Sequence, residues 1–282
     1  MQKNSLLENV FHETTLSSGH NNFQQEYEFE VIRQDTRLKI KDTLKAPFKY
    51  ICSIRFNNEA SGTGTLIGPK TVLTAGHVVW DKGSNKKTDT TKLTVVPAMN
   101  GDTFPKAGAG IYQVSSIIMS KASFRSSDIG GPDDYAIIHL KEAAGNKFGF
   151  WGMSNWSKDK VRTTIHSNKF LPLPAGQITV NICGYPGDED RKDRFGNHQW
   201  LAYNRSAKFS ENRKILEYLN DTFAGHSGSP VWVRRHPSMG GRVMVGIHIS
   251  GITRQNNKIT GKGNRAVYIN DDVRKFIAAN RM

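Results

Sequence analysis

Short apolar runs separated by turn residues dominate the chain from residue 47 onward. Gly, Pro, Asn and Asp stand between the runs, and this alternation is typical of strands joined by turns. Many short strands with few helical periods predict an all-β fold, either a β-sandwich or a pair of β-barrels. The runs are KYICSIRF, TGTLIG, TVLTA, KLTVVP, YQVSSIIM, YAIIHL, QITVNICGYPGD, PVWVRR, RVMVGIHI and RAVYI.

One convincing helical period stands at the end of the chain. Val273, Phe276 and Ile277 fall on one face of a helix, and Asn270 or Asp271 can cap its first turn. The pattern therefore predicts a C-terminal α-helix after the last strand.

The order of the runs predicts two barrels. The sequence between about residues 141 and 175 is irregular, as expected where the chain crosses from one barrel to the next. We therefore expect a first barrel within 31–150, a linker at 151–175, and a second barrel with the helix at 176–282. Residues 1–30 hold five glutamates against one lysine, and this acidic, polar composition indicates a flexible leader, a pro-segment or a plain disordered tail.

Composition bears on size and compartment. A chain of 282 residues that is 37% hydrophobic can bury a sizeable core. No window reaches the roughly 18 consecutive apolar residues of a membrane helix, and the first thirty residues lack the apolar stretch of a secretory signal. We therefore expect no membrane span, and either a cytoplasmic location or a signal-independent export route.

Charge and cysteines give little support to nucleic-acid or metal chemistry. The net charge is +14, but Lys and Arg are scattered and form no nucleic-acid-binding signature. A solvated basic surface and the steering of acidic substrates are the two interpretations. Cys52 and Cys183 lie far apart in apolar runs, and neither a metal-ligand spacing nor an HExxH motif is present. We expect two buried free thiols, no metal and no cofactor.

Three short segments supply candidates for acyl-transfer chemistry. A serine hydroxyl needs an imidazole to take its proton, a carboxylate to hold the imidazole, and donors for the oxyanion. Ser227 lies between glycines, where a tight turn can expose its hydroxyl and aim the amides of Gly225 and Ser227 at one point. His77 follows the strand-like TVL, and Asp134 immediately precedes a buried strand, which makes it a better candidate than Asp133.

These segments resemble a known family. TAGHVV, DYAII and GHSGSP, in the order His, Asp, Ser, are similar to the catalytic signatures of chymotrypsin-like serine proteases. The closer resemblance, over about residues 31–280, is to bacterial glutamyl endopeptidases and the related exfoliative toxins. It implies the trypsin-like fold of two six-stranded antiparallel β-barrels with a C-terminal helix. The motifs that carry it are GTGTLIGPKTVLTAGHVV, GYPGD, DTFAGHSGSP, VGIH and YINDDVRKFI.

The resemblance implies roles for single residues. Ser227 would attack the scissile carbonyl, His77 would shuttle the proton, and Asp134 would fix the tautomer of His77. The amides of Gly225 and Ser227 would form the oxyanion hole. Thr222 and His248 occupy the positions that bind the substrate's glutamate carboxylate in the family. The expected partners are protein or peptide substrates, and the chain is expected to be a monomer.

Alternatives remain at the specificity pocket. Asp221 lies six positions before Ser227, where trypsins keep the aspartate that binds Arg or Lys, so a trypsin-like specificity is the first alternative. The narrow substrate range of an exfoliative toxin is another, and a catalytically silent binding module is a different class. His226 stands where trypsins have the aspartate that pairs with a new N-terminal amine.

The family's mature chains begin near the segment that resembles Val31 to Asp35. Glu30 precedes this position, so a Glu-specific enzyme could cut there itself. We therefore hypothesise that residues 1–30 are an inhibitory pro-segment removed between Glu30 and Val31.

Overall fold

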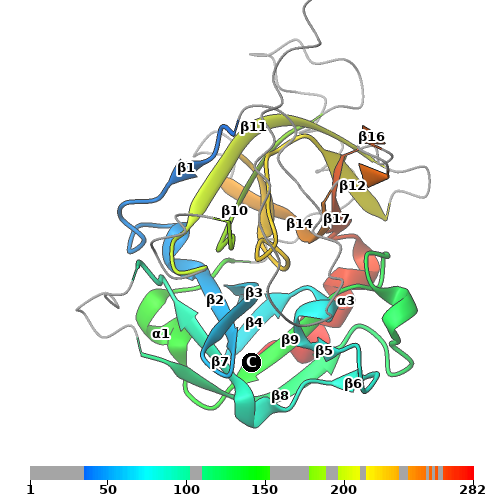
Figure 1. The fold of residues 1–282 in the computed structure, drawn as a ribbon. Coiled ribbons are helices and arrows are strands. Elements are labelled where there is room, and N and C mark those ends of the chain that lie inside the picture. Colours follow the sequence, from blue (N-terminus) through cyan, green and yellow to red (C-terminus); the bar gives the residue numbers. More distant parts are fainter. Residues whose placement is uncertain are drawn as a thin grey trace, which may run out of the picture.

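A computed structural model shows two β-barrels packed against each other and a C-terminal helix (Figure 1). Glu30, Val31 and most of the expected linker lie outside the described residues, so the leader hypothesis stays a prediction. The structure describes residues 35–101, 110–152, 178–188, 196–209, 214–234, 241–251, 254–255, 258–259 and 263–282.

The first barrel is closed by six antiparallel strands in the order β2-β3-β4-β9-β8-β7. Every residue of β4 and β9 is buried, because their outer faces are covered as well, whereas β8 alternates buried and more exposed positions. The strands are β2 (Ile51–Phe56), β3 (Glu59–Leu66), β4 (Thr71–Thr74), β7 (Leu93–Pro97), β8 (Tyr112–Met119) and β9 (Ala136–Leu140).

The second barrel also has six strands. They pair in the order β11-β10-β13-β14-β17-β12, and β12 pairs back with β11 to close the ring. The expectation of two six-stranded antiparallel barrels is therefore confirmed. The strands are β10 (Ile178–Gly184), β11 (Trp200–Phe209), β12 (Ile215–Tyr218), β13 (Pro230–Arg234), β14 (Arg242–Ser250) and β17 (Asn264–Tyr268).

Short elements connect and cover the barrels. The helical ones are the 3₁₀ turns η1 (Phe48–Tyr50), η2 (Gly76–Val79), η3 (Thr90–Lys92) and η4 (Ser126–Asp128), and the helices α1 (Ala144–Phe148) and α3 (Asp271–Asn280). The extended ones are β1 (Leu38–Lys39), β5 (Trp80–Asp81), β6 (Lys86–Lys87), β15 (Arg254–Gln255) and β16 (Lys258–Ile259). Among the described residues, no helix is long and apolar enough to cross a membrane.

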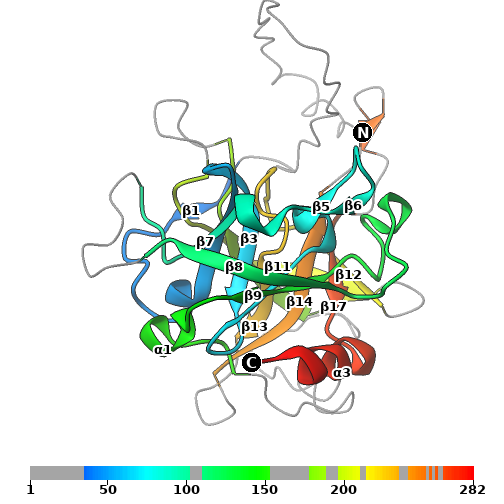
Figure 2. The ribbon, with the colours of Figure 1, turned by 90° about the horizontal axis from the view of Figure 1, so that it is seen from below.

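The two ends of the described chain cross between the barrels. Strand β1 precedes the first barrel in sequence but pairs with β11 of the second. Helix α3 follows the second barrel but packs beside the first (Figure 2). His139 of β9 hydrogen-bonds through Nε2 to the Asn280 carbonyl at 2.7 Å, and the rings of Tyr135 and Phe276 meet edge to face at 5.1 Å. Each barrel is thus braced by a segment from the other half of the chain.

The C-terminal helix forms as expected. The side chain of Asn270 accepts a hydrogen bond from the Val273 amide at 3.0 Å and caps the first turn. Val273 and Ile277 are buried, and Phe276 is half-buried against Tyr135.

Polar groups are buried between the barrels with their partners. Tyr185 is fully buried, and its hydroxyl donates to the Met99 carbonyl at 3.2 Å and accepts from Gln199 Nε2 at 2.7 Å. Cys52 and Cys183 are both buried free thiols, as expected. Burial raises the pKa of the Cys52 thiol, so this cysteine is held in the unreactive protonated form.

Replacing Ile277 by Ala should lower the free energy of unfolding by about 2–5 kcal/mol, because it leaves a cavity where α3 packs. The exposed Lys275 of the same helix is the matched control, and Lys275→Ala should change stability by less than about 0.5 kcal/mol. Urea titrations of both variants measure the difference. Equal stability of the two variants would show that α3 does not support the barrel.

Candidate active site

Strand register brings the histidine and the aspartate to one rim of the first barrel. In the antiparallel pair β4 and β9, Thr74 lies opposite Ala136. His77 comes three residues after Thr74, in the 3₁₀ turn η2, and Asp134 comes two residues before Ala136. Because the end of one strand meets the start of the other, the two side chains reach each other across this edge.

Asp134 holds His77 through two hydrogen bonds. Oδ2 lies 2.8 Å from His77 Nδ1, and Oδ1 accepts from the His77 backbone amide at 2.8 Å. The Gly130 amide donates a third bond to Oδ2 at 2.7 Å. Burial alone raises the pKa of this fully buried carboxyl, but the His77 charge and these hydrogen bonds outweigh burial and lower it. An ionised carboxylate only accepts, so Nδ1 carries the proton and Nε2 is left as the basic nitrogen.

The neighbouring aspartate is differently placed. The Asp133 side chain is 45% exposed and pairs with Lys121 Nζ at 2.9 Å. Lys121 also pairs with Asp128 at 2.8 Å, so these charges form a small surface network. Of the two aspartates, Asp134 is therefore the one directed at His77.

The turn that carries Ser227 packs directly against the first barrel. Gly228 has φ +85°, and a Cβ there would lie 2.0 Å from the Thr63 carbonyl oxygen and 3.0 Å from the Ala75 amide. Only glycine permits this conformation and this approach. Ala75 is the N-cap residue of the 3₁₀ turn that contains His77, so the close contact brings the turn that carries Ser227 to the histidine rim.

Thr63 of β3 clamps this turn. Its amide donates to the Ser227 carbonyl at 2.8 Å, and its hydroxyl donates to the Gly225 carbonyl at 2.8 Å. The same hydroxyl accepts from the Tyr185 amide at 3.0 Å, and the Thr63 carbonyl accepts from Thr74 Oγ1 at 2.7 Å. One residue thus joins the serine turn to the strand that leads to His77. No catalytic motif in the sequence includes Thr63, although its position between Gly62 and Gly64 is a sign of a close approach.

The backbone before Ser227 is arranged with its carbonyls turned into the protein. Ala224 accepts a hydrogen bond from the Gly187 amide at 2.8 Å. Because C=O and N–H point to opposite sides of a trans peptide, the Gly225 amide points away from Gly187. Gly225 has φ +100°, and a Cβ there would lie 2.4 Å from the Tyr185 carbonyl oxygen. In the described part of the chain, neither this amide nor that of Ser227 donates to a backbone carbonyl.

His226 is fully buried beside the turn that carries Ser227. Its Nδ1 lies 3.1 Å from the Phe223 amide nitrogen and 3.2 Å from the Phe223 carbonyl oxygen. Burial, together with the charge of Arg37 and the neighbouring His248, lowers the pKa of His226 well below its usual range. His226 is therefore neutral, and its ring is held against the Phe223 backbone rather than serving as a charged partner for an N-terminal amine.

The three expected pocket residues are all buried in the second barrel. Nδ1 of His248, on β14, lies 2.5 Å from the Tyr218 hydroxyl. Thr222 is fully buried, and its hydroxyl has no hydrogen-bond partner among the described residues. The Asp221 carboxylate accepts from the Thr36 hydroxyl at 2.7 Å and from the Thr36 amide at 3.1 Å.

An N-terminal segment thus reaches the pocket wall. Next to Thr36, the buried Arg37 binds Asp35 at 2.6 Å and also pairs with Asp188, the last residue of GYPGD. Sequence reasoning found GYPGD and Asp221 but missed Thr36 and Arg37, because their partners lie more than 150 residues away.

Comparison with known proteins agrees with this fold. Residues 62–237 match the model of the trypsin-like peptidase domain, and the chain belongs to that family. It is 32% identical over 224 residues, 79% of the chain, to a glutamyl endopeptidase of Bacillus licheniformis. It is 30% identical over 226 residues, 78% of the chain, to a Bacillus subtilis protein named extracellular metalloprotease.

The alignments span 61% and 62% of those two relatives, so the chain covers about three fifths of their length. Among solved structures, a Glu endopeptidase in complex with MPD superposes with a TM-score of 0.63 at 25% identity. The superposition covers 88% of this chain and 98% of that one. These relatives set the family in which the site is interpreted.

Replacing Thr63 by Val should lower kcat/KM by about 10- to 100-fold, because the hydroxyl's hydrogen bonds to the Gly225 carbonyl of the serine turn and from the Tyr185 amide are both lost. Thr65 is a matched control on the same strand, since its buried hydroxyl has no partner among the described residues. Thr65→Val should keep full activity. Peptide hydrolysis and urea unfolding on both variants separate loss of positioning from loss of folding.

Proposed function

We propose that the protein is a serine endopeptidase that uses Ser227 as nucleophile and His77 as general base. The observation that best supports this proposal is the buried, ionised Asp134, which fixes Nδ1 of His77 as the donor and leaves Nε2 to take the serine proton. The Thr63 contacts hold the serine turn at the same rim.

The reaction follows from these positions. His77 removes the proton from Ser227 as the hydroxyl attacks the scissile carbonyl, and the amides of Gly225 and Ser227 bind the oxyanion. His77 then protonates the leaving amine, and water resolves the acyl-enzyme by the same route in reverse. Asp134 stays ionised throughout and stabilises the imidazolium form of His77.

Ser227→Ala should lower kcat by about 10⁶-fold through loss of the nucleophile, and Asp134→Asn by about 10⁴-fold through loss of the correct histidine tautomer. Asp133→Asn is the matched control, because this adjacent carboxylate faces Lys121 and solvent, and it should keep near wild-type activity. Hydrolysis of a fluorogenic peptide panel gives the rates. Undiminished hydrolysis by purified Ser227→Ala protein would favour the catalytically silent binding module instead.

We further propose that cleavage follows Glu, and less readily Asp. Two observations support acidic specificity. His248 is oriented by Tyr218, and both His248 and the Thr222 hydroxyl are buried, as the glutamyl-endopeptidase resemblance implies for a carboxylate site. Asp221, which would attract Arg or Lys, is already engaged by two hydrogen bonds from Thr36. The named glutamyl endopeptidase relative supports the same choice. The trypsin-like alternative through Asp221 remains the competing specificity.

Peptides that differ only in Glu, Arg or Phe before the cut distinguish these specificities. His248→Gln should lower kcat/KM for the Glu peptide by about 10- to 100-fold, since one charge-assisted hydrogen bond is lost. Asp221→Asn, which keeps an acceptor for Thr36, should leave the Glu peptide nearly unaffected. Preferential Arg cleavage that disappears in Asp221→Asn would establish the trypsin-like specificity.

A further inference from the structure

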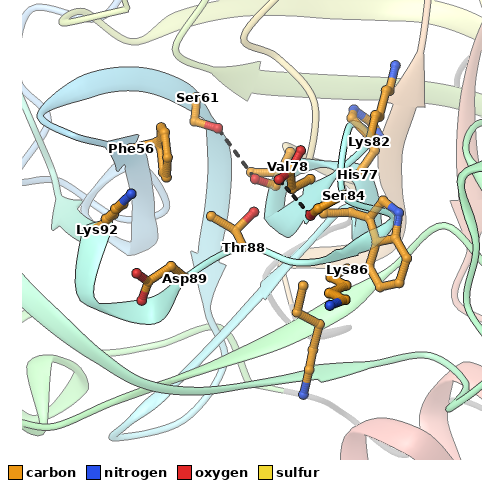
Figure 3. Close-up of a pocket in the computed structure, with 13 residues that line it drawn as sticks. Phe56, Ser61, His77, Val78, Lys82, Ser84, Lys86, Thr88, Asp89 and Lys92 are labelled. Atoms are coloured by element: carbon orange, nitrogen blue, oxygen red, sulfur yellow. Dashed lines mark hydrogen bonds between the residues drawn. The ribbon is translucent and has the colours of Figure 1, made fainter.

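A second pocket borders the catalytic histidine on its first-barrel side. It encloses about 510 Å³, within the usual range of ligand pockets, and Figure 3 shows the residues that line it. Phe56 and Lys92 form one wall, and His77, Lys82 and Lys86 belong to the opposite side. All lining residues come from the first barrel and its loops, so this pocket is separate from Thr222 and His248.

The wall formed by the β5–β6 hairpin is fixed to the barrel. Trp80 packs edge to face on Phe124 at 5.0 Å and donates through Nε1 to Ser126 Oγ at 3.3 Å. Asn85 at the hairpin tip accepts from the Ser126 amide at 3.2 Å and from its hydroxyl at 3.1 Å. These contacts position the hairpin before any ligand binds, which reduces the entropy lost on binding.

The pocket carries a net positive charge, because its lining holds four lysines against two aspartates. Its two carboxylates are held by local turns: Asp81 accepts from the Ser84 hydroxyl at 2.7 Å and Asp89 from the Thr91 hydroxyl at 2.8 Å. Lys87 donates to the Ile117 carbonyl at 3.1 Å. The other three lysines of the lining are exposed and form no ion pair with a described residue. They are Lys82, Lys86 and Lys92.

We propose that this pocket, hereafter the lysine pocket, binds an acidic side chain of the substrate on the leaving-group side of the scissile bond. The proposal rests on the proposed function. His77 must hand its proton to the leaving amine, so the residues after the cut leave the site next to His77. The lysine pocket is lined by His77 itself and by residues of the first barrel, and its three exposed lysines are the charges that a carboxylate there meets.

Internally quenched peptides with a constant segment before the cut provide the test. Asp, Asn or Lys is placed at the first, second or third position after the cut. We expect Asp at one of these positions to raise kcat/KM about tenfold over Asn, with Lys lower still, and the preference to fall with added salt because the lysines are exposed.

The variant Lys82→Gln, Lys86→Gln, Lys92→Gln should abolish the Asp preference and leave the rate on the Asn peptide nearly unchanged. The matched control is a triple variant that removes the same charge from exposed lysines outside the pocket. It carries Lys41→Gln, Lys45→Gln and Lys275→Gln, and it should keep the Asp preference. An Asp preference that survives in the pocket variant, or that is equally lost in the control, overturns the proposal.

Binding separates this proposal from the proposed function. Ser227→Ala protein should bind a fluorescent peptide with Asp after the cut site more tightly than its Asn counterpart, and the pocket substitutions should remove the difference. If no peptide is cleaved but this binding difference persists, the proposed function fails while the lysine pocket stands. If peptides are cleaved and neither cleavage nor binding responds to the three lysines, the lysine pocket fails alone.

Discussion

Thr63 joins the two barrels at the point where their contributions to the site meet. Its amide and hydroxyl hold the Ser227 and Gly225 carbonyls of the second barrel, and its carbonyl receives the Thr74 hydroxyl of the first. A serine and a histidine on separate barrels can act together only if their separation is fixed to a fraction of an ångström. Thr63 fixes this separation through its backbone and one short side chain, which have few alternative conformations.

Buried charge imposes a second constraint, because an isolated carboxylate in the interior is strongly unfavourable. The Asp134 carboxylate is compensated by three N–H donors: two belong to His77 and orient it, and the third is the Gly130 amide. Asp221 accepts two hydrogen bonds from Thr36, and Asp188 forms an ion pair with Arg37. The segment before β1 therefore supplies hydrogen bonds and charge to two carboxylates on the second-barrel side. Through Asp221, this segment is tied to the proposed specificity pocket.

Sequence predicted the parts of this structure that are encoded locally. The strand runs, the Asn270 cap and the glycines around Ser227 depend on neighbours within a few residues. The resemblance then supplied barrel closure and residue roles. The Thr63 contact to Gly225 spans 162 residues and the Thr36 contact to Asp221 spans 185, and no local pattern specifies such pairs. The crossing of β1 and α3 between barrels escaped prediction for the same reason.

In the sequence, the lysines near His77 are not distinguished from the other scattered basic residues. The fold brings them together around one pocket. Strands β5 and β6 pair Asp81 with Lys86, and the turn η3 carries Lys92 to the far wall. The two proposed pockets therefore depend on different physical effects. His248 and Thr222 are buried, so the proposed preference for a carboxylate before the cut depends on desolvation and hydrogen-bond geometry and resists salt. The lysine pocket is exposed, so the attraction proposed for a carboxylate after the cut is screened within about 10 Å at ordinary ionic strength. The two proposals therefore differ in their expected response to ionic conditions, although both concern a carboxylate.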